Sequence, residues 1–244
     1  MPIAKHERTR AALIWTGLRL LPVIDRALTR FSALEERAVH ANEQFPWLAD
    51  LEDNWQLIRA EADAVLRDLR AVPPVRAISP DHEQIAIDER WRSFFLWGYG
   101  LRWDRNCRRC PRTADLLDNV PGLLSAFFSV LEPGAHIPRH TGPTKAILTA
   151  HLGLRVPRDR TACHMQVGQQ DLAWQEGRAI VFDDMYPHEV WNDTDEARVV
   201  LLMQLKRPER FPGSLVRDGL IAAMRRSPFV QDGLRNLAGW NDGA

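Results

Sequence analysis

The sequence predicts a mainly β protein, a sandwich or jelly roll, with helices added at both ends. Between residues 123 and 205, short apolar segments alternate with turn signals, and no helical pattern separates them. The chain has 244 residues, enough for one good-sized core. No internal repeat, linker or low-complexity segment divides it. We therefore expect one core domain with helical additions.

Helical patterns precede and follow this β region. Residues 11–38 are predicted to be helical, with a break near Pro22. From Trp47 to Arg70, apolar residues recur at three- and four-residue spacing, which is typical of an amphipathic helix, and Val72-Pro73-Pro74 stops it. A C-terminal amphipathic helix is predicted over residues 214–226, where apolar residues share one face.

The strands are predicted from apolar runs that end at prolines, glycines and acidic turns. Residues 75–90 are predicted to form a loop, and Thr113 is predicted to be the N-cap of a short helix. The predicted strands are Trp91–Tyr99, Leu123–Leu131, Ala146–Val156, Thr161–Val167, Gly177–Phe182, His188–Asn192 and Arg198–Leu205.

Composition narrows the class of protein. Lys and Arg total 32 and Asp and Glu total 32, so no overall positive field attracts nucleic acid. Three cysteines are too few for a disulfide scaffold, which favours a reducing, cytoplasmic compartment. We expect a helical segment over 1–44, a core domain over 45–208 and a helical tail over 209–244. The oligomeric state is not indicated by the sequence.

The N-terminal apolar run has two interpretations. Residues 11–24 are too short for a spanning helix, which needs roughly 20 residues, and they lack a cleavage site. Basic residues lie on both sides of the run. The helix is expected either to pack on the domain or to lie on an anionic membrane surface, which would make the protein peripheral at the inner membrane face.

Three histidines and one arginine stand out in the β region. His140, His151 and His188 lie in predicted strands or at their ends. Two histidines and a carboxylate make a typical iron(II) site, with the carboxylate two residues after the first histidine, but the residue two after His140 is Gly142. Arg198 lies in an otherwise apolar strand, so it must pair with an anion or lie at the rim. A guanidinium suits a carboxylate in a bidentate pose.

Alternation sorts the side chains of the strand around His151 into two faces. The apolar face should pack between the sheets or against the helices; it consists of Leu148, Ala150, Leu152 and Leu154. The other face should line a polar pocket; it carries Ile147, Thr149, His151 and Gly153. Trp191, near His188, either walls this pocket or fills the core.

Two further pairs carry open alternatives. Cys107 and Cys110 form a CxxC that is half a zinc site, a redox pair or simply two packing residues. Asp183 and Asp184 precede His188, and either could orient an imidazole or cap the turn.

Several segments, in this order, resemble the aspartyl/asparaginyl β-hydroxylase family of Fe(II)- and 2-oxoglutarate-dependent oxygenases, which includes bacterial lipid A hydroxylases. They are HxxxHxGP from His136, HLGL from His151, the FDD and HEVWN stretches up to Asn192, and the later Arg198. Upstream, RWRSFFLWGYG and NCRRCPRTADLL are similar to bacterial members. The resemblance covers roughly residues 45–208.

This resemblance implies a double-stranded β-helix, a jelly-roll and cupin-like fold, and a dioxygenase that uses O₂, with ascorbate as the reductant in vitro. It implies that His140 and His188 are the iron ligands, with water at the position of Gly142. It implies that the 2-oxoglutarate contacts are Ser129, His151 and Arg198.

One departure from the family pattern bears on the substrate. The aspartyl hydroxylases that the chain resembles carry arginines at the positions of Ile147 and Thr149. Without these cations, burying a substrate carboxylate costs several kcal/mol. We therefore expect a lipid or acyl substrate, or a small or carrier-bound metabolite, rather than a protein aspartate. A non-catalytic binding module for 2-oxoglutarate or metal and a zinc-dependent hydrolase are the alternatives.

Overall fold

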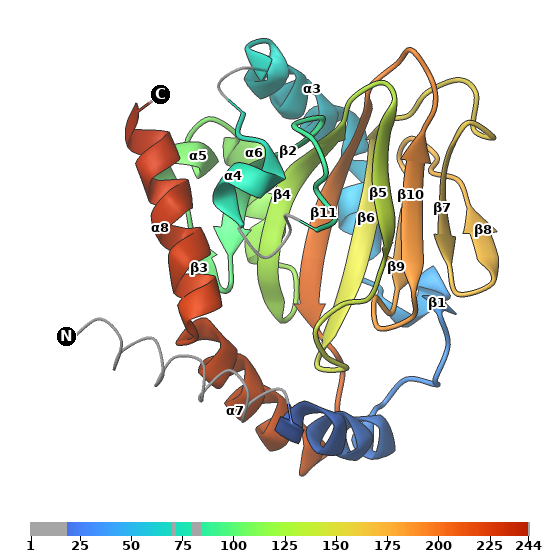
Figure 1. The fold of residues 1–244 in the computed structure, drawn as a ribbon, viewed down its shortest axis with the longest axis vertical. Coiled ribbons are helices and arrows are strands. Elements are labelled where there is room, and N and C mark those ends of the chain that lie inside the picture. Colours follow the sequence, from blue (N-terminus) through green and yellow to red (C-terminus); the bar gives the residue numbers. More distant parts are fainter. Residues whose placement is uncertain (1–18, 70–71, 80–83, 244) are drawn as a thin grey trace.

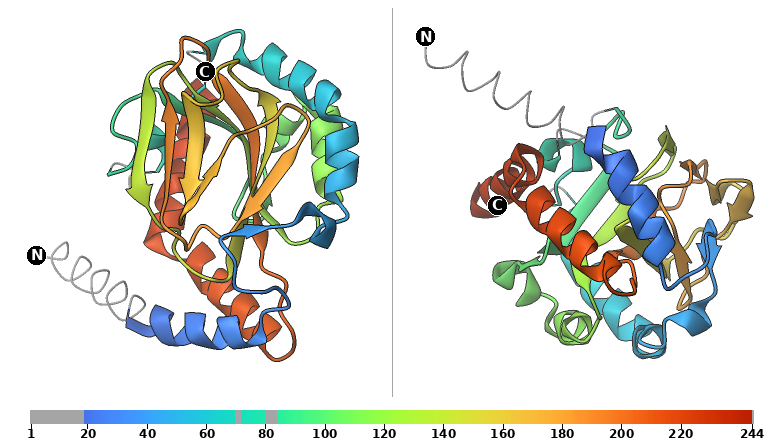
Figure 2. Two further views of the ribbon diagram at one scale, coloured as in Figure 1. Left: turned by 90° about the vertical axis from the view of Figure 1, so that its right-hand side faces the viewer. Right: turned by 90° about the horizontal axis from the view of Figure 1, so that it is seen from below.

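The computed structural model describes residues 19–69, 72–79 and 84–243 (Figure 1). Two antiparallel sheets face each other, and helices cover the outer side of the larger sheet and its lower end (Figures 1 and 2). This arrangement is the double-stranded β-helix, or jelly roll, and it confirms the predicted fold class.

The larger sheet holds most of the predicted strands. Its order is β1 (Val39–His40), β9 (Ala179–Phe182), β6 (Ile147–Arg155), β11 (Arg198–Lys206), β4 (Leu123–Leu131), β2 (Trp91–Gly98) and β3 (Leu101–Arg102). The smaller sheet has the order β5 (Ala135–His140), β10 (His188–Asn192), β7 (Cys163–Val167) and β8 (Gln170–Leu172). The strand β5 was not predicted, because Pro138 and its polar neighbours hide the alternation.

The helices lie outside this sandwich. The N-terminal helix, as far as the structure describes it, spans residues 19–31. The others are η1 (Asn42–Gln44), α2 (Leu48–Asp53), α3 (Trp55–Leu66), α4 (Val75–Ile78), α5 (Asp104–Cys107), α6 (Pro111–Asp118), α7 (Gly213–Arg225) and α8 (Pro228–Gly243). No helix in the described part of the chain is long and apolar enough to cross a bilayer.

Two cores hold the layers together. On the outer face of the larger sheet, the predicted apolar set of β6, from Leu148 to Leu154, packs against Leu48 and Leu51 of α2 and Ile58 of α3. A second core lies between the two sheets, where Phe182 packs with residues of β5, β7 and β10. The alternation along β6 therefore assigns its apolar face correctly.

Several helix predictions were wrong in detail. The N-terminal helix continues past Pro22 and ends at Phe31, because Ile24 and Leu28 pack in a third core with Ile221 of α7. Residues 11–18 of that prediction lie outside the described residues. The predicted helix from Trp47 is interrupted at Asn54, whose side-chain amide donates to the Asp50 carbonyl at 2.8 Å.

Two local predictions between the helices also fail. Residues 75–78 form α4, not loop. Thr113 is not an N-cap, because α6 already begins at Pro111. Its hydroxyl instead donates to Glu61 of α3 at 2.6 Å, which ties the two helices together.

Candidate active site

The structure brings His140 and His188 together across two neighbouring strands. His140 ends β5 and His188 begins β10, and the antiparallel register places them directly opposite each other. Their ring centroids are 4.1 Å apart. Turns before and after these strands fix the register, so the pair is set by the backbone of the smaller sheet.

Backbone carbonyls set the tautomer of both rings. The Nδ1 of His140 is 2.7 Å from the Pro138 carbonyl oxygen, and the Nδ1 of His188 is 3.0 Å from that of Tyr186. A carbonyl oxygen only accepts, so each Nδ1 donates and each Nε2 keeps its lone pair. Burial lowers the pKa of His140, and burial and the neighbouring His140 lower the pKa of His188 to about 4. Both rings are therefore neutral near pH 7 and suited to bind a metal.

The space beside Gly142 is filled by a carboxyl group from another segment. A Cβ at Gly142 would lie 2.7 Å from Oδ2 of Asp184 and closer still to Oδ1. The Gly142 amide donates to the Asp184 carbonyl at 2.7 Å, and the Thr149 hydroxyl donates to Oδ2 at 3.0 Å. Oδ1 is buried without a hydrogen-bond partner, and burial raises the Asp184 pKa to about 7. Asp184 thus occupies the position that a side chain at 142 would take.

The neighbouring Asp183 holds together the loop after His140 and the loop before His188, which we call the histidine loops. It is fully buried and forms ion pairs with Lys145, at 2.9 Å, and with Arg207. Lys145 follows His140, and Asp183 precedes His188. Asp183 also accepts from the Met185 amide at 3.0 Å. It therefore caps the turn, as one prediction allowed, and the side-chain hydrogen bonds of Asp183 and Asp184 in the described residues go to groups other than imidazoles.

Arg198 is buried without a counter-ion. It is 1% exposed, so it does not lie at the rim. Its Nε has no hydrogen-bond partner, its Nη1 reaches only the Ser129 carbonyl at 3.5 Å, and no carboxylate in the described residues forms an ion pair with it. Burial lowers its pKa only to about 10, so it stays charged. A buried cation of this kind requires an anion that the described protein does not supply.

Further unused donors lie around Arg198. The His151 Nδ1 accepts from Trp174 Nε1 at 3.2 Å, so its proton is on Nε2, which is buried without a partner. The hydroxyl of Ser129 accepts from Trp91 at 3.0 Å and keeps its own proton to donate. Ser93, opposite Ser129 in the register, also has a buried hydroxyl without a partner.

Two aromatic rings connect this donor group to the histidine pair. Trp174 is fully buried, with the Arg198 guanidinium 4.6 Å from its ring centre and the His151 ring beside it. Phe182 packs edge-on against both His151, at 5.1 Å, and His188, at 5.6 Å. The unpaired cation, the free imidazole proton and the two available Nε2 atoms are therefore neighbours in one buried region.

Other predicted site residues are not in this region. Ile147 is buried in the third core with Leu28 of the N-terminal helix. Trp191 lies on the opposite face of β10 from His188, where its ring stacks between His136 and His164. Of the three tentative pocket residues, only Thr149 contacts the site: its hydroxyl bonds Asp184, whose carboxyl group lies beside Gly142.

Trp174 and the position of Asp184 were missed by the sequence analysis. Trp174 lies between strands, where no alternation marks which way a side chain points. Asp184 approaches Gly142 from 42 residues away, and only a folded structure reveals that contact. A usable signal was the pairing of a glycine, where a carboxylate was expected, with an acidic pair before His188.

Of the three alternatives for Cys107 and Cys110, the structure agrees with packing residues. Cys107 and Cys110 are free and buried in the main core, and burial raises the Cys110 pKa to about 12.

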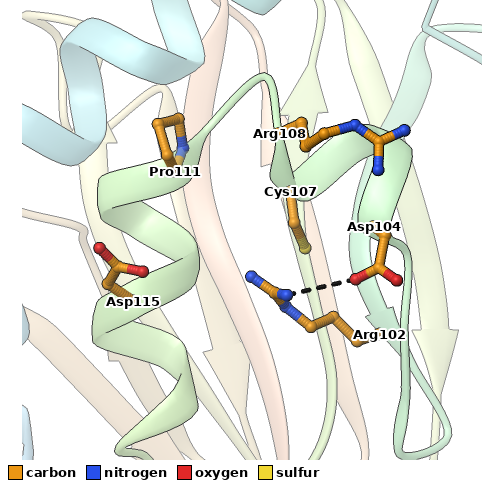
Figure 3. Close-up of a pocket in the computed structure, with 6 residues that line it drawn as sticks. All are labelled: Arg102, Asp104, Cys107, Arg108, Pro111 and Asp115. Atoms are coloured by element: carbon orange, nitrogen blue, oxygen red, sulfur yellow. Dashed lines mark hydrogen bonds and ion pairs between the residues drawn. The ribbon is translucent and has the colours of Figure 1, made fainter.

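A surface pocket of about 380 Å³ opens beside Cys107 (Figure 3); it is lined by Arg102, Asp104, Cys107, Arg108, Pro111 and Asp115. Within the described residues, no group of three or more His, Cys, Asp or Glu side chains could hold a metal.

Comparison with known proteins shows the family of the chain. The family model for aspartyl/asparaginyl β-hydroxylases matches residues 52–208, which include every member of the buried region. The chain belongs to this family.

The names of its relatives within the family refer to different substrates. An ornithine lipid ester-linked acyl 2-hydroxylase from Rhizobium tropici is 39% identical over 86% of this chain and 75% of its own. The human aspartyl/asparaginyl β-hydroxylase is 33% identical over 66% of this chain and 21% of its own. Among solved structures, a Pseudomonas putida prolyl-4-hydroxylase has a TM-score of 0.42 and is 19% identical, over 66% of this chain and 98% of its own.

Proposed function

We propose that this protein is an Fe(II)- and 2-oxoglutarate-dependent dioxygenase that hydroxylates an unactivated C–H bond in an acyl chain of a lipid. Family membership supports the hydroxylase class. The observation that carries the proposal is the buried, unpaired Arg198 next to the His140 and His188 pair.

The donor group fits a dicarboxylate. Arg198 can pair with a carboxylate through a bidentate contact, and the Ser129 hydroxyl can donate to the same group. Bound there, the anion would satisfy the guanidinium that has no counter-ion in the protein. The unpartnered Nε2–H of His151 gives a further donor, and Phe182 packs against both this ring and that of His188.

The histidine pair fits a divalent metal held by two imidazoles. Both Nε2 atoms keep lone pairs, and both rings are fixed by carbonyl acceptors, the usual outer support of a metal-binding histidine. Iron(II), when bound, would supply oxygen activation coupled to oxidative decarboxylation of 2-oxoglutarate to succinate. The unpartnered Oδ1 of Asp184 can accept a hydrogen bond from water at the position left without a protein ligand.

The chain itself contributes positioning and exclusion of water. Trp174 and Phe182 close the region around His151 with apolar rings, which strengthens the pairing of Arg198 with an anion. The Asp183 ion pairs fix the two histidine loops relative to each other.

An acyl substrate agrees with the charges near the histidine pair. Thr149 and Ile147 supply no cation, and the carboxyl group of Asp184 lies beside Thr149. Lys145 and Arg207 are already paired with Asp183. A substrate carboxylate would therefore be buried near another carboxyl group without a partner, whereas an alkyl chain carries no such cost. The ornithine lipid acyl hydroxylase at 39% identity points the same way.

The first test is turnover. Purified protein with Fe(II), ascorbate, oxygen and 2-oxoglutarate should form succinate, and succinate formation should rise when an ornithine-containing or other acylated lipid is added. Mass spectrometry of the lipid should show one added oxygen on an acyl chain. His188→Ala should lower succinate formation by at least about 100-fold, because a direct metal ligand is lost.

His136→Gln is the matched control, because His136 lies on the other face of the same sheet and bonds Glu189. It should keep wild-type turnover. Tight binding of 2-oxoglutarate without succinate under these conditions would instead favour the non-catalytic binding module. Zinc-dependent hydrolysis with no need for oxygen would contradict the proposal outright.

A further inference from the structure

Exposed apolar side chains gather on two segments at the lower end of the molecule. Leu20 and Val23 of the N-terminal helix are 53% and 60% exposed. Phe211, just before α7, is 77% exposed, and Leu215 in its first turn is 63% exposed. None of these four side chains belongs to a core cluster of the described residues. They are therefore apolar groups that are exposed to water without contributing to a core.

The two segments are joined to each other by backbone hydrogen bonds and by the third core. The N-terminal helix and α7 lie side by side below the sheets (Figure 2). The Ala33 amide donates to the Pro208 carbonyl at 2.9 Å, and the Arg210 amide donates to the Phe31 carbonyl at 2.8 Å. We call the outer side of these two segments the terminal-helix face: Leu20, Val23, Arg26, Arg30, Phe211, Leu215 and Val216.

Folding does not account for this surface. The inward side chains Ile24, Leu28 and Ile221 already join both helices to β6 and β4 through the third core. The helices are therefore held by their opposite faces. Within the part of the chain that the structure describes, no core covers the terminal-helix face.

The charges around this face define the partner. Residues 19–31 and 206–226 together contain nine basic and three acidic residues, although the whole chain is neutral. Three of the basic residues are already paired, Arg207 with Asp183, and Lys206 and Arg217 with Asp218. Two of the acidic residues are bonded within the chain: Asp25 accepts from Thr144 at 2.6 Å, and Asp218, which is partly exposed, pairs with Lys206 at 3.0 Å. The third, Glu209, is partly buried, and burial raises its pKa to about 7.

Exposed cations therefore flank the apolar side chains. Arg26 and Arg30 lie on the exposed side of the N-terminal helix, one and two turns beyond Val23. The acidic residues that follow this helix are paired elsewhere, Glu35 with Arg37 and Glu36 with Lys145. Apolar side chains bordered by arginines match the boundary between acyl chains and anionic headgroups.

We infer that the terminal-helix face binds the surface of an anionic lipid bilayer and thereby brings the active site to its acyl substrate. Asp25 of this helix accepts from Thr144 and the Lys145 amide, in the loop that follows His140. The face is thus attached directly to the histidine loop. The choice of substrate rests on the proposed function, but the binding itself needs neither metal nor turnover.

Vesicle sedimentation tests the inference with the full chain and no iron or 2-oxoglutarate. Wild-type protein should bind vesicles of phosphatidylglycerol and phosphatidylcholine, and it should bind pure phosphatidylcholine far more weakly. Phe211→Ser/Leu215→Ser should reduce binding by about tenfold or more, because two large apolar groups no longer enter the interface. Arg26→Gln/Arg30→Gln should reduce it roughly 25-fold, at about fivefold per arginine.

The controls are matched in exposure. Ile87→Ser/Leu101→Ser removes exposed apolar side chains elsewhere, and Arg158→Gln/Arg160→Gln removes exposed arginines elsewhere. Both should bind like wild type, and thermal melting should show all variants folded. No vesicle binding by wild type, equal binding by all variants, or a stable dimer that Phe211→Ser/Leu215→Ser dissociates would overturn the inference. Succinate formation by the wild type without vesicles tests the proposed function separately, because it does not depend on membrane binding.

Discussion

At the residue scale, the buried guanidinium of Arg198 gives the strongest support for a ligand-binding site. Arg198 is 1% exposed and its Nε has no partner, so the protein alone leaves it unsatisfied. A residue kept for stability would be expected to have a counter-ion, since an unpaired buried charge costs several kcal/mol. Arg198 is therefore best understood as a site that is completed by its ligand.

Replacing Arg198 with methionine should separate these roles. Arg198→Met removes the unpaired charge and keeps most of the volume, so the free energy of unfolding should stay the same or rise by up to about 2 kcal/mol. Binding of 2-oxoglutarate, measured by calorimetry with Mn(II) in place of iron, should be lost. Arg158→Met, at an exposed arginine, should change neither quantity. A large loss of stability with 2-oxoglutarate binding retained would show that Arg198 is structural.

Gly142 makes a second prediction at this scale. A methyl group there would collide with the Asp184 carboxyl group, so Gly142→Ala should lower the free energy of unfolding by about 1–3 kcal/mol. It should also lower the affinity for Mn(II), because the collision lies between the two histidine loops. Asp184→Gly in the same chain should restore part of the stability.

The control for this substitution is Gly219→Ala in α7, which has nothing within 4 Å of a new Cβ. It should leave stability unchanged or raise it by up to about 1 kcal/mol through helix propensity. If Gly142→Ala behaved like Gly219→Ala in thermal melting, the close approach of Asp184 would be wrong.

At the scale of elements, two loops must be held in register for the histidines to meet. Lys145 and Arg207 both contact Oδ2 of the buried Asp183, and Arg207 also donates to the Lys145 carbonyl at 2.7 Å. The N-terminal helix and α7 hold the same cluster from outside, because Arg217 donates to the Arg207 carbonyl at 2.8 Å.

Removing the charge at Asp183 should loosen this arrangement. Asp183→Asn leaves two cations close together without their shared anion, so the free energy of unfolding should fall by about 3–5 kcal/mol. The affinity for Mn(II) should fall with it. Adding Lys145→Met should recover part of both losses, which a simple loss of packing would not allow. Asp171→Asn, at an exposed carboxylate on β8, serves as the control.

The sequence predicted the strands well, because most are apolar runs between turn residues. The helices were harder. Neither the interruption at Asn54 nor the start of α6 at Pro111 shows in the apolar pattern. β6 shows both outcomes: its apolar face was assigned correctly, but Ile147, at its first residue, packs under the terminal helices and not in the site.

At the scale of the whole molecule, the order of motifs predicted the site better than local chemistry did. His140, His188 and Arg198 were identified from a resemblance that spans much of the chain, and the fold brings them to one buried region. Asp184 and Trp174 came from loops, where neither alternation nor helical spacing indicates direction. Their roles depend on contacts between segments far apart in sequence.

The active site is also connected to the terminal-helix face. The buried region lies between the two sheets, and the terminal-helix face lies below them, connected through Asp25 and the loop after His140 (Figure 1). A lipid hydroxylase needs both features, because its substrate is held in a bilayer.

The most direct test of the central claim is a crystal structure of the protein grown without oxygen, with Mn(II) and 2-oxoglutarate. We expect the ion to lie on the Nε2 atoms of His140 and His188, and one carboxylate of the ligand to lie on the guanidinium of Arg198. Imidazole rings turned away from a shared ion, or an Arg198 paired with a protein carboxylate while the ligand binds elsewhere, would contradict the account.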